Sequence, residues 1–132
     1  MKKINAIWII DDDPIQVFLA KRLLTNLGVT HIRTMDNAEN ALKELHALRA
    51  IKDSAFPNII FVDINMPQMD GWQFLQEFDK MTLEEDVDIY LVTSSINPID
   101  VERASSNPNL SGYLIKPLKT ADLAEIIKKY LE

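Results

Sequence analysis

At residues 59–71 the sequence reads IIFVDINMPQMDG, an apolar run that ends in a carboxylate and then in turn-forming residues. The apolar run is typical of a strand covered on both faces. Pro67 and Gly71 oppose a simple helical continuation. Open α/β folds place ligands outside the carboxyl ends of their parallel strands. We therefore expect Asp63 to be displayed at the edge of a sheet rather than buried, where other polar residues can join it.

The same alternation of apolar strand and amphipathic helix extends along the whole chain. The patterns predict strands at 7–10, 31–35, 59–62, 89–92 and 113–115, and helices at 14–27, 37–48, 72–78, 98–105 and 121–131. Five alternating pairs predict an α/β fold, a doubly wound parallel sheet of five strands with helices on both faces. The absence of a linker or repeat predicts a single domain over residues 1–132.

Helix boundaries are predicted from capping residues. Asp13 followed by Pro14 is typical of a helix start, and Gly28 of a helix end. Asp36, with Glu39 three residues later, resembles a capping box for the second helix. Thr120 is the expected cap of the last helix.

Composition limits the classes of function. The chain has 132 residues, 47% hydrophobic and 26% charged, which predicts a folded domain with a sizeable core. It has no cysteine, which excludes disulfides and thiolate metal sites. A net charge of -6 disfavours nucleic acid as a partner and suits cations. No run of residues has the length of a membrane span or the form of a signal peptide, so we expect a cytoplasmic protein.

Polar residues follow four of the predicted strands. Asp11 and Asp12 come after the first, Asp63 after the third, Thr93 after the fourth and Lys116 after the fifth. Because the carboxyl ends of parallel strands share one edge of the sheet, these side chains are expected to meet. Clustered carboxylates repel one another, and a divalent cation relieves that repulsion. Oxygen ligands without His or Cys favour Mg²⁺.

A hydroxyl and an ammonium opposite the acids suit a phosphoryl group. Lys116 and Thr93 would neutralise and hydrogen-bond phosphoryl oxygens, which is the arrangement that phosphoryl transfer requires. Asp63, alone at its strand end, is the expected nucleophile that forms an acyl phosphate.

Taken in order, four motifs resemble those of the response-regulator receiver domains of two-component signalling. They are WIIDDDP at residues 8–14, FVDINMPQMDG at 61–71, LVTSS at 91–95 and GYLIKPL at 112–118. The resemblance extends over essentially the whole chain and implies a flavodoxin-like (βα)5 fold. It also implies a phosphorelay switch, a phosphoprotein that takes its phosphoryl group from the phosphohistidine of a sensor histidine kinase or a phosphotransfer protein.

The resemblance implies a role for each matching residue. Asp63 would accept the phosphoryl group. Asp12 and Asp63 would bind Mg²⁺ together with the backbone carbonyl of Asn65, and Asp11 would contribute through water.

Other implied roles concern the switch. Thr93 would hydrogen-bond the phosphoryl group, Lys116 would pair with it, and Tyr113 would change rotamer with Thr93. The Lys116–Pro117 peptide would be cis. The surface from Pro98 to Tyr130, formed by the fourth helix, fifth strand and fifth helix, would change for a downstream protein target.

Simpler interpretations stand beside these roles. Residues 11–13 could form a helix cap and a solvated turn, Lys116 could be an ordinary surface lysine, and Tyr113 could be a half-buried strand aromatic. Asp70 and Gly71 are expected to be structural, with Gly71 supplying a turn conformation that few other residues adopt.

Other classes of function are also weighed. A haloacid-dehalogenase-type phosphatase needs a second acid two residues after its nucleophile, and Asn65 occupies that position. A flavin or nucleotide carrier lacks support because the chain has only 3 glycines and no glycine-rich phosphate loop. A degenerate receiver that only binds is disfavoured by the intact acids. We therefore expect a signalling switch rather than an enzyme, with no output domain in this chain.

Overall fold

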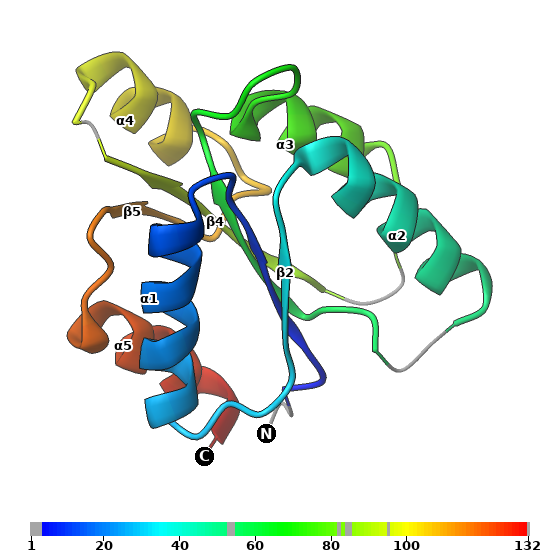
Figure 1. Cartoon of the computed structure of the whole chain (residues 1–132). Coiled ribbons are helices and arrows are strands. Elements are labelled where there is room, and N and C mark those ends of the chain that lie inside the picture. Colours follow the sequence, from blue (N-terminus) through cyan, green and yellow to red (C-terminus); the bar gives the residue numbers. More distant parts are fainter. Residues whose placement is uncertain (1–3, 53–54, 82, 84–85, 95, 132) are drawn as a thin grey trace.

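The apolar runs form the strands of one parallel sheet. The computed structural model describes residues 4–52, 55–81, 83, 86–94 and 96–131 (Figure 1). In this part of the chain the strands are β1 (Ile7–Ile10), β2 (Ile32–Met35), β3 (Ile59–Asp63), β4 (Asp88–Thr93) and β5 (Gly112–Ile115). The helices are α1 (Pro14–Asn26), α2 (Ala38–Ala50), α3 (Gly71–Asp79), α4 (Pro98–Ser105) and α5 (Thr120–Leu131).

The strand order is β2-β1-β3-β4-β5, and every neighbouring pair is parallel. This confirms the predicted doubly wound sheet. The order reverses beside β1, where the chain returns from β2 to β3, and the carboxyl ends of β1 and β3 therefore border the crevice in which this fold class binds ligands. None of the helices in the described part of the chain is both long and apolar enough to cross a membrane.

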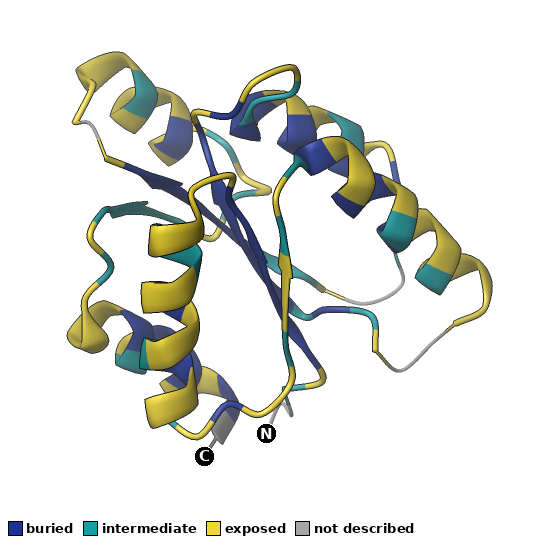
Figure 2. Cartoon of the chain, viewed as in Figure 1, coloured by how far each residue is buried: buried dark blue, intermediate teal, exposed yellow. Residues whose placement is uncertain are grey.

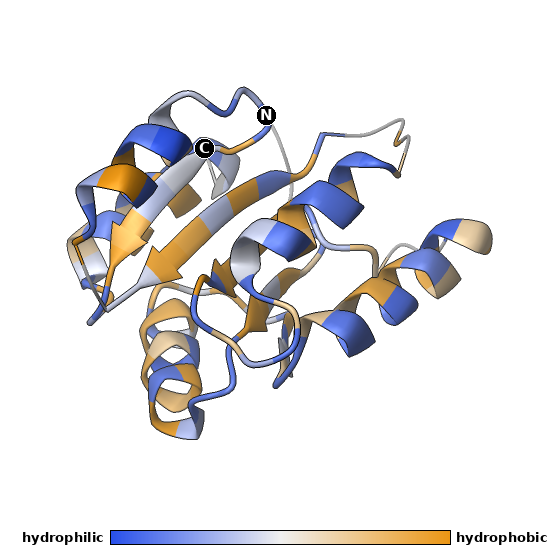
Figure 3. Cartoon of the chain, turned by 90° about the horizontal axis from the view of Figure 1, so that it is seen from above, coloured by the Kyte–Doolittle hydropathy of each residue, from blue (hydrophilic) through white to orange (hydrophobic). Residues whose placement is uncertain are grey.

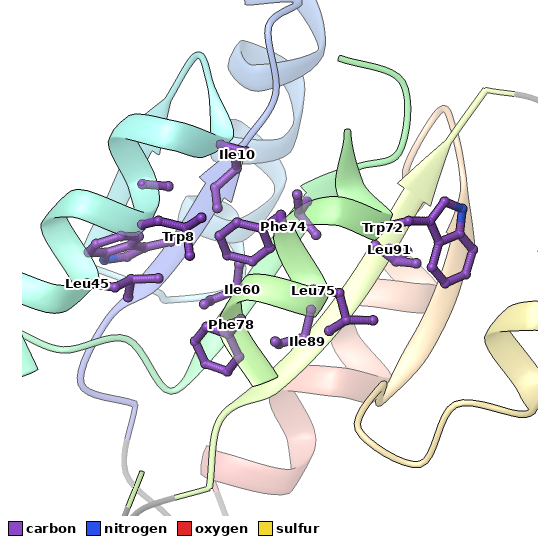
Figure 4. Close-up of a cluster of buried hydrophobic side chains, with 14 of the residues drawn as sticks. Trp8, Ile10, Leu45, Ile60, Trp72, Phe74, Leu75, Phe78, Ile89 and Leu91 are labelled. Atoms are coloured by element: carbon purple, nitrogen blue, oxygen red, sulfur yellow. The ribbon is translucent and has the colours of Figure 1, made fainter. Parts of the chain in front are cut away.

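Two hydrophobic clusters cover the two faces of the sheet. Because successive strand residues point to opposite faces, Ile7 and Ile9 face α1 and α5, whereas Trp8 and Ile10 face α2 and α3. Buried residues accordingly run along the central strands and the inner sides of the helices (Figure 2). Figure 3 shows the same division by hydropathy, with mainly hydrophobic strands between helices of mixed character. The cluster between the sheet and helices α2 and α3 is the larger of the two and contains both tryptophans (Figure 4).

Some helix ends follow the prediction. The Asp13 side chain accepts from the Ile15 amide, with Pro14 at the first helical position of α1. Gly28, at φ 95°, ends α1, where the amides of Gly28 and Val29 donate to Thr25 and Leu24.

Two predicted caps are wrong. Asn37 caps α2, since its side chain accepts from the Asn40 amide, while Asp36 instead accepts from the Asn37 side chain. Thr120 is the first residue of α5 rather than its cap, and the Lys119 carbonyl accepts from the Leu123 amide. For α2, two adjacent polar residues could serve as the cap, and the Asn37 side chain does so.

The connection from β3 to α3 has a tight backbone. Gln68, at φ 68°, supplies its left-handed residue, and the Gly71 amide donates to the Ile64 carbonyl. A Cβ at Gly71 would lie 2.8 Å from the Asp63 carbonyl oxygen and 2.9 Å from the Ile64 Cα. Gly71 is therefore structural as predicted, but for close backbone approach and not for an unusual turn conformation.

Candidate functional site

The polar strand ends meet at one edge of the sheet. Asp63 pairs in register with Val92, and Thr93 with Ile115, so the ends of β3, β4 and β5 lie side by side. Asp11 follows β1, whose last residue pairs with Val62. The predicted convergence is confirmed for these strand ends.

Lys116 joins the two buried acids. Its Nζ lies 2.7 Å from Asp11 Oδ2 and 3.3 Å from Asp63 Oδ2, and its side chain is only 9% exposed. This excludes an ordinary surface lysine. Asp63 itself is 5% exposed, so the expectation of a displayed carboxylate was wrong. The lysine from β5 covers the end of β3, which the local sequence around Asp63 does not reveal.

The surroundings of Asp63 disfavour its charged form. Burial, followed by the negative charge of Asp11, raises the pKa of Asp63 to about 6, against the opposing effects of Lys116 and the Asn65 amide. For Lys116, burial favours the neutral amine, but the hydrogen bond and charge of Asp11, together with Asp63, outweigh burial and raise its pKa. The ammonium is therefore held charged between two carboxyl groups.

The acids at residues 11–13 have separate roles. Asp11 is buried and its Oδ1 accepts from the Asp13 amide, whereas Asp13 caps α1. Asp12 is exposed, and one oxygen each of Asp11, Asp12 and Asp63 lie within 4.8 Å of one another. Three convergent carboxylates without His or Cys are a donor set that fits a hard divalent cation such as Mg²⁺.

Asn65 and Thr93 lie next to Asp63 at the same edge of the sheet and are connected to it by hydrogen bonds. The Asn65 amide donates to Asp63 Oδ1 at 3.2 Å, and its side-chain nitrogen donates to Thr93 Oγ1 at 3.4 Å. Thr93 is buried at the end of β4. Asp63 thus contacts the Lys116 ammonium directly and is connected to the Thr93 hydroxyl through Asn65, a combination of groups that suits a phosphoryl group.

Comparison with known proteins agrees with this geometry. The sequence matches the family described as the Response regulator receiver domain over residues 7–128. The chain belongs to this family. This receiver domain is 30% identical over 123 residues to the probable C4-dicarboxylate response regulator DctR of Bacillus subtilis, covering 92% of this chain and 50% of that relative. The chain therefore spans about half the length of that protein.

Solved structures share the fold. A two-component response regulator from Cytophaga hutchinsonii has a TM-score of 0.87 and 29% identity, with 97% of each chain covered. The receiver domain of the histidine kinase CKI1 from Arabidopsis thaliana, complexed with Mg²⁺, has a TM-score of 0.79 at 23% identity, covering 94% of this chain and 90% of that one. At that identity the likeness shows the fold alone.

In this receiver domain Tyr113 is half-buried on β5. Burial, followed by the negative charge of Asp100, raises the pKa of its phenol, while a side-chain hydrogen bond with Thr93 acts in the opposite direction. Tyr113 thus contacts the residue whose movement it is predicted to follow. The predicted cis peptide is present at Lys116–Pro117.

Sequence reasoning missed the neighbourhood of Tyr113 on α4. Asp100 accepts a hydrogen bond from the indole of Trp72, and Arg103 lies over the same ring. Trp72 belongs to α3 and Asp100 to α4, and the two residues are 28 positions apart along the chain. No local pattern signals the contact, because an acid in the first turn of a helix has an ordinary role there.

Proposed function

We propose that this receiver domain is a phosphorylation-dependent signalling switch whose phosphoacceptor is Asp63. The donor would be a phosphohistidine on a sensor histidine kinase or a phosphotransfer protein. A bond forms between a carboxylate oxygen of Asp63 and phosphorus as the phosphorus–nitrogen bond breaks, and the imidazole leaves with that electron pair. The chain would act as a signalling component of a phosphorelay and not as an enzyme that turns over external substrates.

One observation carries the proposal: the Lys116 ammonium lies between Asp11 and Asp63. Its positive charge stands where the incoming phosphoryl group adds negative charge, and its shielding from water strengthens that interaction. Asp11 keeps the ammonium in place after Asp63 is modified. The hydroxyl of Thr93, held near Asp63 through Asn65, would then donate to a phosphoryl oxygen.

Mg²⁺ is proposed as the cofactor. Asp12 and Asp63 would hold it with the backbone carbonyl of Asn65, and Asp11 would contribute through water. The support is the cluster of three acids and its oxygen-only donor set. When bound, the ion would neutralise charge between the carboxylates and the phosphoryl oxygens.

The proposed output is a change in the surface formed by α4, β5 and α5. Thr93 would turn toward the phosphoryl group and Tyr113 would follow, since the two side chains share a hydrogen bond. A downstream protein that prefers the changed surface would bind it, and a nucleic acid or membrane partner is not expected with a net charge of -6. We place this activity in the cytoplasm. Asn65 and Ser95 are expected to influence the lifetime of the acyl phosphate, but Ser95 lies outside the described residues.

The proposal is tested with beryllofluoride, a phosphoryl mimic, by following tryptophan fluorescence. Wild type should show a saturable change that requires Mg²⁺, and Asp63→Asn should show none. An equal response in Asp63→Asn would overturn the proposal. In parallel, a panel of phosphomonoesters should not be hydrolysed at a useful rate, and catalytic turnover of them would favour a phosphatase instead.

A further inference from the structure

Helix α4 has little apolar attachment to the rest of the molecule. Ala104 is its buried residue, while Ile99 is 74% exposed and Val101 is also exposed. A short helix with few buried contacts is expected to open at low free-energy cost unless other contacts hold it. Such contacts come from Trp72, at the start of α3.

Trp72 contacts two residues of α4 that lie on one side of that helix. Its Nε1 donates to Asp100 Oδ1 at 3.2 Å, and the Arg103 guanidinium carbon lies 4.3 Å from the indole centroid. Trp72 is 6% exposed and belongs to the hydrophobic cluster, at the opposite end from Trp8 in Figure 4. A buried indole N–H needs a hydrogen-bond partner, and a cation over the ring adds attraction. We name Trp72, Asp100 and Arg103 the α3–α4 clamp.

The clamp is connected to the phosphorylation site by two routes. Through space, Asp100 lies close enough to Tyr113 to influence its phenol, and Tyr113 hydrogen-bonds with Thr93. Along the chain, Thr93 ends β4 and α4 begins at Pro98, so a short connection joins them. A movement of Thr93 toward a phosphoryl group would therefore pull on α4, which the clamp contacts connect to α3.

In the unmodified protein, the Thr93 side chain contacts other side chains instead of a phosphoryl group. Its Oγ1 accepts from the Asn65 side chain and it also pairs with Tyr113. These contacts and the clamp are present together in one arrangement. A contact formed in only one of two states shifts the equilibrium toward that state by its own free energy.

We propose that the α3–α4 clamp holds α4 in its unphosphorylated position, and that Trp72 and Asp100 are positioning residues that oppose the switch. This inference rests on the proposed function. It adds a specific claim, that weakening the clamp makes Asp63 a better phosphoryl acceptor although none of the three clamp residues belongs to the site.

The test measures beryllofluoride affinity at fixed excess Mg²⁺ by ¹⁹F NMR. Trp72→Phe keeps the ring and removes the N–H, Asp100→Ala removes the acceptor, and the double variant completes a cycle. Each single variant should bind about three- to tenfold more tightly, which is the scale of one hydrogen bond. The double variant should bind no more tightly than the stronger single variant, because both remove the same contact. Glu102→Ala, an exposed acid on the same helix, should match wild type.

Helix opening gives an independent measurement. In the first turn of α4, the Val101 amide donates to the carbonyl of the capping residue Asn97, and its hydrogen exchange should be faster in both clamp variants but not in Glu102→Ala. A merely destabilising substitution would not tighten beryllofluoride binding.

The outcomes separate the two proposals. If wild type binds beryllofluoride but the clamp variants bind with wild-type or weaker affinity, or if their effects add in full, the clamp proposal fails and the proposed function stands. If wild type does not bind at all, the proposed function fails and the clamp proposal fails with it.

Discussion

Asp63 is a carboxyl group that its surroundings make costly to ionise. Its pKa is raised to about 6 from the ordinary 3.8, chiefly by burial and then by Asp11. The folded protein therefore binds more protons at this site than the unfolded chain between about pH 4 and 6. The stabilising contribution of this group is present at low pH and is lost as the pH rises through about 6.

The substitution Asp63→Asn tests this at the residue scale. Without metal, the variant should be more stable than wild type by on the order of 1–2 kcal/mol at pH 7, because a neutral amide avoids the repulsion from Asp11 and the cost of a buried charge. The difference should be small at pH 4 and grow up to about pH 6.5. Urea unfolding in EDTA across this range measures it. Glu125→Gln, an exposed acid on α5, should show no such growth, and a constant difference for Asp63→Asn would contradict the account.

Single residues also show what sequence reasoning can and cannot reach. The position of Asp63 at a strand end follows from the apolar run before it and the turn residues after it. Its burial does not, because the covering side chain, Lys116, arrives from β5, more than 50 positions later. Partners that are distant in sequence leave no local pattern.

At the scale of elements, the β3–α3 connection determines where Asp63 is held. Gly71, the first residue of α3, lies against the Asp63 carbonyl. Asp70 and Gln73 form a capping box at the start of this helix, in which the side chain of each accepts a hydrogen bond from the backbone amide of the other. The backbone of Asp63, the proposed phosphoacceptor, thus packs against the first turn of a well-capped helix.

Gly71→Ala should therefore affect both stability and the site. The added methyl would meet backbone atoms at 2.8 and 2.9 Å, and backbone cannot move aside as a side chain can. A loss of about 1–3 kcal/mol in the free energy of unfolding is expected, with weaker beryllofluoride binding. Gly28→Ala is the matched control: the surroundings of Gly28 are open, but alanine would be strained at φ 95°, so the change should cost about 1–2 kcal/mol and leave binding unchanged. Unchanged binding in Gly71→Ala would refute the role of this contact.

Element types were predictable, whereas some boundaries were not. Apolar patterns predicted most strands and helices because burial on the sheet selects them, whereas α4 was predicted from Asn97 and Pro98 at its start and β2 has only a weak pattern. The caps at Asp36 and Thr120 were wrong by one residue, since adjacent polar side chains such as Asp36 and Asn37 compete for one position and tertiary packing decides between them.

At the scale of the whole molecule, the parallel sheet brings residues from four strand ends to one edge. That topology places Asp11, Asp63, Thr93 and Lys116 together, and helix–strand alternation had predicted the parallel sheet that produces it. The site was predictable for this reason. The α3–α4 clamp was not, because it depends on how two helices pack against each other.

Mg²⁺ should stabilise the whole domain if the acidic cluster binds it. The protein carries a net charge of -6, and three acids converge within 4.8 Å. At ten times its Kd, the ion should raise the free energy of unfolding by about 1.4 kcal/mol. Thermal unfolding with and without Mg²⁺ measures this, and Asp12→Asn should lose most of the increment. An equal increment in Asp12→Asn would place the ion elsewhere.

Phosphorylation of Asp63 is the central claim, and intact mass spectrometry after incubation with acetyl phosphate tests it most directly. Wild type with Mg²⁺ should gain the mass of one phosphoryl group, the gain should disappear with EDTA, and Asp63→Asn should gain nothing. A wild type that remains unmodified, or an Asp63→Asn variant that gains the same mass, would contradict the account.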